Sequence, residues 1–156
     1  MFDKFGEFDS AEELNKAAEG LRNEGDRESL IELAKENGID PEDAEDYFSG
    51  EMEKLAGNRL AAIARLKVEK KASSIPDMAR DVIYGMAMLM AAESDQDAAR
   101  FMRKGARIDG VWKIMEDMAR DNKQGNVGFA CGTDLDLRKM ILSALGRRNG
   151  ASRGVS

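Results

Sequence analysis

Apolar residues recur at intervals of three and four positions along nearly the whole chain, the spacing that gathers side chains on one face of an α-helix. Two prolines, Pro41 and Pro76, are the main interruptions, and runs of Val, Ile and Thr, which favour strands, are scarce. The pattern predicts an all-α fold, a compact helical bundle of about seven to eight helices. We expect the N-terminal part to form an acidic helical subdomain.

Capping residues mark the first helix starts. Ser10 followed by Glu13 is a capping box, and Asp26 is a typical N-cap residue. Asp40 is a further N-cap, because Pro41 behind it suits the first helical position. With glycines closing each segment, we expect helices over residues 10–24, 26–37 and 40–49.

The later segments are read from periodicity. We expect a fourth helix from near Glu51 up to a polar stretch, Glu69–Ser74, that separates two halves. The fifth segment, after Pro76, is rich in methionine and should be central, with a homodimer through it as one option. Further helices are expected over 94–104, 111–121 and from Thr133, after a break at 125–132. The domain prediction is an acidic module at 1–58, a helical core domain at 59–146 and a disordered tail at 147–156.

Several classes of site are disfavoured by composition. The chain of 156 residues has no histidine, the commonest general base and metal ligand, and Cys131 is its one cysteine. No stretch approaches the about 18 apolar residues of a membrane span, and the first residues lack a secretory pattern. We therefore expect a cytoplasmic, non-enzymatic protein without metal or cofactor.

Charge is divided unevenly along the chain. Residues 1–58 hold 18 acidic and 6 basic residues, a net charge of −12, whereas residues 59–156 hold 12 acidic and 18 basic ones, a net charge of +6. A protein this asymmetric is expected to use one part for a basic partner and the other for an acidic one.

The densest acidic cluster surrounds the third helix. Its short spacing suggests a calcium loop, but the mid-loop glycine and closing glutamate of an EF-hand are missing, and Pro41 favours a helix start. The same carboxylates could imitate nucleic-acid phosphates and occupy a basic groove of another protein, or could form a plain solvated face. The candidate partner-binding residues are Asp40, Glu42, Asp43, Glu45, Asp46, Glu51 and Glu53.

A basic set follows on the sixth and seventh helices and their connection. Such residues could track the phosphates of a nucleic acid, pair with the acidic N-terminal region, or be solvated. The candidate nucleic-acid-binding residues are Arg100, Arg103, Lys104, Arg107, Lys113 and Lys123.

The C-terminal segment carries a family resemblance. Residues Ile114–Arg120, the small-residue loop Asn126–Thr133 and the capped segment Asp134–Met140 resemble the closing region of the PcfK-like proteins of conjugative elements. That family includes inhibitors of the CRISPR nuclease Cas9, so the resemblance implies a non-catalytic inhibitor. It supplies no catalytic residue. The chain departs from the family's final aromatic pair, with Leu145-Gly146-Arg147 in its place.

The N-terminal segment is similar to a leader module on mobile-element proteins of anaerobic gut bacteria, through Phe8–Asn15, Glu36–Asp40 and Asp46–Gly50. Together the two resemblances lead to the hypothesis of an anti-CRISPR protein. It would bind Cas9 or a related RNA-guided nuclease, or its guide-RNA complex, and block target DNA binding or cleavage through the acidic cluster. The alternative is a nucleic-acid-binding accessory protein of a conjugative or mobile element.

Overall fold

The computed structural model describes residues 1–121 and 134–154, and every regular element in these ranges is an α-helix. This confirms the all-α prediction and the number of helices expected for the bundle. The helices are α1 (Ala11–Asn23), α2 (Arg27–Glu36), α3 (Pro41–Ser49), α4 (Asn58–Ala72), α5 (Asp77–Glu93), α6 (Asp95–Met102), α7 (Gly110–Asp121) and α8 (Asp134–Gly154). Among the described residues, no helix combines the length and apolar character needed to cross a membrane.

The predicted caps start the first three helices. The hydroxyl of Ser10 accepts a hydrogen bond from the amide of Glu13 at 3.1 Å, while the Glu13 carboxylate reaches back to the amide of Asp9 at 2.7 Å. Asp26 accepts from the amide at position 29, and Asp40 from the amide at position 42. These bonds satisfy N–H groups that have no partner inside the helix.

The predicted start of the fourth helix near Glu51 is wrong, because α4 begins at Asn58. Leu55 and Ala56 have helical spacing but lie in an irregular segment, and both are buried. The side chain of Asn15 on α1 holds this segment. Its oxygen accepts from the amides of Leu55 and Ala56 at 3.0 and 3.2 Å, and its nitrogen donates to the Ala56 carbonyl at 2.7 Å.

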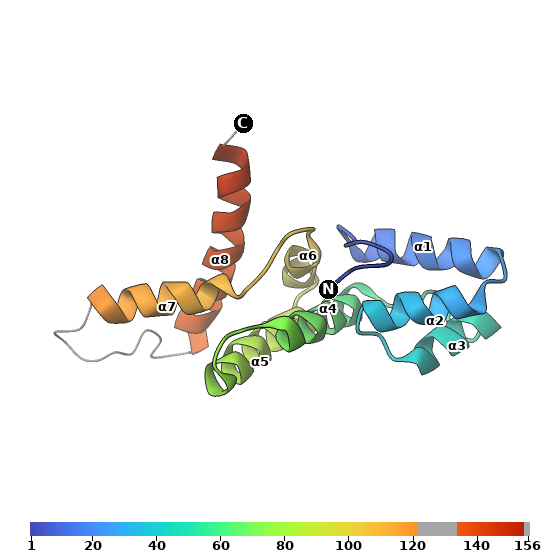
Figure 1. Ribbon diagram of the computed structural model, residues 1–156, viewed down its shortest axis with the longest axis horizontal. Coiled ribbons are helices and arrows are strands. Elements are labelled where there is room, and N and C mark those ends of the chain that lie inside the picture. Colours follow the sequence, from blue (N-terminus) through green and yellow to red (C-terminus); the bar gives the residue numbers. More distant parts are fainter. Residues whose placement is uncertain (122–133, 155–156) are drawn as a thin grey trace.

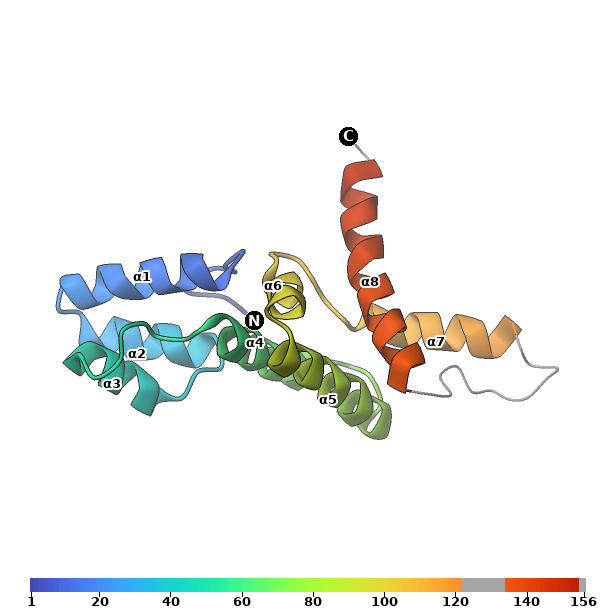
Figure 2. The ribbon, with the colours of Figure 1, turned by 180° about the vertical axis from the view of Figure 1, so that it is seen from behind.

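The helices form an elongated molecule with α1, α2 and α3 at one end and α7 and α8 at the other (Figure 1). Helix α4 lies in the middle and contacts α1, α5 and α6, and α5 also contacts α6 and α8. The view from behind shows the same order along the molecule (Figure 2). The polar stretch 69–74 was expected to separate two halves of the chain. Most of it forms the last turn of α4, which ends at Ala72.

The prediction that α5 is central holds for one of its faces. Ile83, Tyr84 and Met90 are buried there. The opposite face is apolar but exposed, which corrects the expectation that these residues belong to the core. Its large side chains are Met78 (85% exposed), Val82 (59%) and Leu89 (46%).

The bounds of α6 and α7 lie close to the predicted ones, whereas α8 is longer than expected. Helix α7 covers the predicted segment, and α6 ends at Met102, two residues before the predicted end. The bounds of α8 take in residues 147–154, which the sequence reading assigned to a tail. The predicted break at 125–132, Cys131 and the cap Thr133 lie outside the described residues.

Candidate functional site

The acidic candidates lie on α3 and on the segment that follows it, at the end of the molecule opposite α7 and α8 (Figure 1). Two of them are used locally. The Asp40 carboxylate caps α3 at 2.9 Å from the amide of Glu42, and Glu45 accepts from the Arg27 guanidinium at 2.8 Å. These two carboxylates therefore stabilise the module in which they lie.

The other five acidic candidates have no ion pair among the described residues. Glu42, Glu51 and Glu53 are exposed, and Asp43 and Asp46 are half-buried. None of the five lies within 4.0 Å of a described basic side-chain nitrogen, including those of the positively charged C-terminal part. The structure thus leaves these carboxylates available for a partner. No group of three or more potential metal ligands in the described part of the chain is arranged to hold an ion.

A buried charge cluster joins the N-terminal segment to the α6–α7 connection, and the sequence reading missed it. Glu7 and Arg107 form a bidentate salt bridge. Arg107 Nη2 donates to Glu7 Oε1 at 2.6 Å, and Arg107 Nη1 donates to Glu7 Oε2 at 2.9 Å. Glu7 Oε2 also accepts from the amide of Gly105 at 2.6 Å. These bonds keep the pKa of Glu7 below its ordinary value, against the opposing effect of burial.

Arg65 of α4 is the most deeply buried arginine of this cluster, with 1% of its surface exposed. Its Nη1 donates to the carbonyl of Met102 at 2.7 Å, its Nη2 donates to the carbonyl of Phe8, and its guanidinium lies 3.4 Å from Glu7. Burial lowers the pKa of Arg65, while nearby Glu7 opposes this. The arginine therefore ties α4 to both the N-terminal segment and the end of α6.

Glu69, one turn after Arg65, is the least satisfied member. It is 3% exposed, and its Oε1 lies 3.5 Å from Arg107 Nη1 but has no hydrogen-bond partner. Burial raises the pKa of Glu69 to about 8, although Arg107 and Arg65 act in the opposite direction. The carboxyl group is thus mostly protonated at neutral pH.

A second part of the cluster lies around Asp109. Its Oδ1 accepts from the hydroxyls of Tyr84 at 2.7 Å and Ser73 at 2.8 Å, and burial raises the pKa of Tyr84 well above its ordinary value. These bonds join α4, α5 and the start of α7. Because the bonds of the cluster join the N-terminal segment, α4, α5 and the α6–α7 connection, we interpret the whole cluster as a structural junction.

Three of the five predicted basic candidates that the structure describes form ion pairs within the chain. Arg107 belongs to the buried cluster, and Arg100 and Lys113 pair with Asp97 and Asp117 on their own helices. Arg103 and Lys104 are exposed, and Lys123 lies outside the described residues. The structure does not bring this set together as one free surface. Pairing between acidic N-terminal and basic C-terminal residues does occur, but through Glu7 and not through the acidic candidates.

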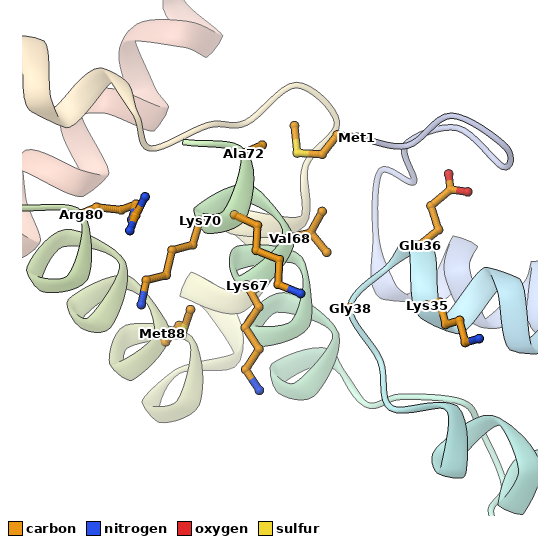
Figure 3. A pocket seen from close by; sticks show the side chains of 11 residues that line it. Met1, Lys35, Glu36, Gly38, Lys67, Val68, Lys70, Ala72, Arg80 and Met88 are labelled. Carbon is orange, nitrogen blue, oxygen red and sulfur yellow. The ribbon is translucent and has the colours of Figure 1, made fainter. Parts of the chain in front are cut away.

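A different basic site emerges from the fold. A groove with a volume of ≈ 930 Å³ lies between the end of α2, the last turns of α4, and α5. Five cationic side chains line it, and Glu36 is the one acidic residue among its described lining. Figure 3 shows Arg80 and Lys70 at one end of the groove, Lys35 at the other end and Lys67 between them. The cationic residues are Lys35, Lys67, Lys70, Lys71 and Arg80.

The groove brings together residues that are distant in the sequence. Gly38 makes the contact that closes it, because its backbone, at φ 74°, lies against the carbonyl of Ala64 on α4 with no room for a Cβ atom. The signal present in the sequence was the group of lysines at positions 67, 70 and 71, of which Lys70 and Lys71 belong to the stretch interpreted above as polar, 69–74.

Comparison of the chain with family models, with curated proteins and with solved structures gives no match.

Proposed function

We propose that this protein is a non-catalytic, cytoplasmic inhibitor that binds Cas9 or a related RNA-guided nuclease, alone or with its guide RNA. The observation that carries the proposal is the set of acidic side chains on α3 and residues 50–57 that have no cationic partner among the described residues. RNA-guided nucleases hold nucleic acids in positively charged channels and read a short DNA motif with arginines. A carboxylate array that is not neutralised internally suits such a channel, and the PcfK-like resemblance favours this class of partner.

The binding surface consists of Glu42, Asp43, Asp46, Glu51 and Glu53, with Asp40 and Glu45 as supporting residues. The carboxylates of Asp40 and Glu45 cap α3 and fix it to α2, so they hold the surface in position. Target DNA would be excluded by competition for the same basic residues. The proposed mechanism therefore needs no reaction and no cofactor.

A DNA-cleavage assay with purified Cas9 and guide RNA tests this proposal. The variant E42Q/D43N/E51Q/E53Q removes four free charges and should raise the concentration needed for inhibition by about tenfold or more, since tenfold corresponds to about 1.4 kcal/mol of binding free energy. The matched control E24Q/E28Q/E116Q/D121N removes four exposed charges elsewhere and should inhibit like the wild type. Equal inhibition by both variants would exclude the acidic surface, and no inhibition by the wild type would exclude the function.

The alternative, a nucleic-acid-binding accessory protein of a mobile element, has one observation in its favour, which is the basic groove. Of the residues predicted for it, Arg100, Arg107 and Lys113 form ion pairs within the chain. A homodimer also remains a proposal. The exposed face of α5 with Met78, Val82 and Leu89 is the surface through which it would form, because these side chains lie at helical spacing without cover.

A further inference from the structure

The basic groove has an excess of positive charge that the described residues do not neutralise. The Glu36 carboxylate accepts hydrogen bonds from the amides of Lys4 and Phe5 at 3.1–3.4 Å, so its oxygens are occupied. Lys70 and Arg80 each have one exposed acidic partner, Asp81 at 3.1 Å and Asp77 at 2.9 Å respectively.

The remaining three cations of the groove are Lys35, Lys67 and Lys71. All three are exposed, and none has an ion pair among the described residues. The groove therefore has three free cations, and two more that are held only by surface carboxylates.

The arrangement of the lysines on α4 favours a chain of charges over a single anion. Lys67 and Lys71 are four residues apart and so lie about 6 Å apart along the helix axis. Lys35 from α2 and Arg80 from α5 lie to either side of the α4 lysines, so the cations are spread along the groove (Figure 3). This spread suits a ligand that carries several separated charges, such as a phosphate backbone.

The chemistry of the lining favours DNA over an acidic peptide. Lysine and arginine supply only hydrogen-bond donors, and the one carboxylate of the lining is already occupied. A peptide brings backbone N–H groups that need acceptors, whereas the phosphates and sugars of DNA bring acceptors alone. The groove thus matches the donor and acceptor pattern of a DNA backbone.

The lining also indicates how the strand is recognised. Its described residues include no aromatic side chain, so bases have no stacking platform there, and contacts are restricted to the backbone. A volume of ≈ 930 Å³ is that of a site for a drug-sized molecule, so the groove contacts only a few nucleotides of one strand.

We propose that the groove lined by Lys35, Lys67, Lys70, Lys71 and Arg80 binds the sugar-phosphate backbone of single-stranded DNA without sequence preference. This site is distinct from the acidic surface and does not depend on nuclease inhibition. Because the protein carries a net charge of −6, the affinity is modest and depends on salt.

Fluorescence anisotropy of a labelled oligo(dT) of about 12 nucleotides tests the proposal with the full chain. Three free lysines predict a slope of about −2 for the logarithm of the association constant against the logarithm of salt concentration, at about 0.7 per phosphate contact. The variant K67Q/K71Q should reduce the slope to about −0.7. The charge-matched control K54Q/K139Q, with both residues outside the groove, should keep the wild-type slope.

A variant that gains affinity tests whether a loss of binding in K67Q/K71Q could result from misfolding. D77N/D81N removes the partners of Arg80 and Lys70, so it should tighten binding and steepen the slope to about −3.5. A misfolded variant would not bind more tightly. R103Q/K104Q tests the alternative basic surface and should bind like the wild type.

The proposal is overturned by any of four results. These are no binding by the wild type at low salt, a wild-type slope for K67Q/K71Q, no gain for D77N/D81N, or a loss confined to R103Q/K104Q. Polyglutamate tests the choice of ligand. If it displaced the oligonucleotide more strongly than unlabelled oligo(dT) did at equal charge concentration, the groove would be a site for acidic peptides instead.

Discussion

Replacing Glu69 by Gln should stabilise the protein at alkaline pH and flatten the pH dependence of its stability. The carboxyl group is buried, its pKa is raised from 4.5 to about 8, and Oε1 lacks a hydrogen-bond donor. Below pH 4.5 the carboxyl group is mostly protonated in both the folded and the unfolded chain, so its ionisation does not reduce the free energy of unfolding there. As the pH rises toward 8, the unfolded chain ionises first and the free energy of unfolding decreases.

The size of the effect follows from the shift. A rise from 4.5 to about 8 corresponds to about 5 kcal/mol, at about 1.36 kcal/mol per unit. Relaxation and water entry reduce the cost of a buried charge, so this value is a ceiling. We expect the wild type to lose about 2–5 kcal/mol of unfolding free energy through this group between about pH 5 and pH 9. Gln retains the shape of the side chain, and Arg107 keeps its two bonds to Glu7.

The contribution of Glu7 to the pH dependence of stability does not overlap with that of Glu69. Its pKa is lowered, so the stability it provides is present above its ordinary pKa of 4.5 and is lost as the pH falls further. That loss lies on the acid side of the interval over which Glu69 titrates. The two glutamates of one cluster therefore act in separate pH ranges.

Urea unfolding followed by circular dichroism, repeated across this pH range, measures the effect. E69Q should show a smaller decrease than the wild type, and the exposed control E53Q should follow the wild type. If E69Q lost as much stability as the wild type, or were less stable at alkaline pH, Glu69 would be an ionised partner of Arg107 and Arg65, and the argument from burial would be wrong.

Two further substitutions test contacts between elements that are distant in the sequence. Gly38→Ala should cost more than about 2 kcal/mol because of its positive φ and its contact with the Ala64 carbonyl, whereas Gly25→Ala, with a similar φ of 72° but open space, should cost about 1 kcal/mol. Equal losses in thermal melting would contradict this reading of the contact. Asn15→Ala should cost about 1–3 kcal/mol and speed hydrogen exchange at the amide of Leu55, which loses its acceptor. Unchanged exchange there would show that the segment does not depend on Asn15.

The parts of the fold that were predictable from sequence depend on local chemistry. Ser10, Asp26 and Asp40 each cap the helix that follows, as their positions indicated. Such bonds join residues two or three positions apart, so the sequence contains both partners in one window. The start of α4 has no such signal. Its cap, Gly57, provides no side-chain hydrogen bond, and the acceptor that stops residues 51–57 from forming helix is on Asn15, 41 positions from Ala56.

The exposed apolar face of α5 shows a second limit. Periodicity indicates which faces of a helix are apolar, but it does not indicate which of those faces pack against other helices. Helix α5 has α4, α6 and α8 as neighbours, and they leave Met78, Val82 and Leu89 uncovered. A helix that is apolar on both faces is usually enclosed. The sequence therefore predicted a central helix and did not distinguish the covered face from the exposed one.

The candidate sites were harder to predict because net charge does not reveal which charges are free. Arg65 and Glu69 occupy the buried face of α4, and a charge on such a face requires partners. Those partners come from Glu7, 58 positions before Arg65, and from Arg107, 100 positions after Glu7. Once these charges are assigned to the interior, the carboxylates of α3 and its following segment and the lysines of the groove are two of the exposed charged groups that remain. The acidic surface was predictable because its residues are neighbours in the sequence, whereas the groove required the fold to bring α2, α4 and α5 together.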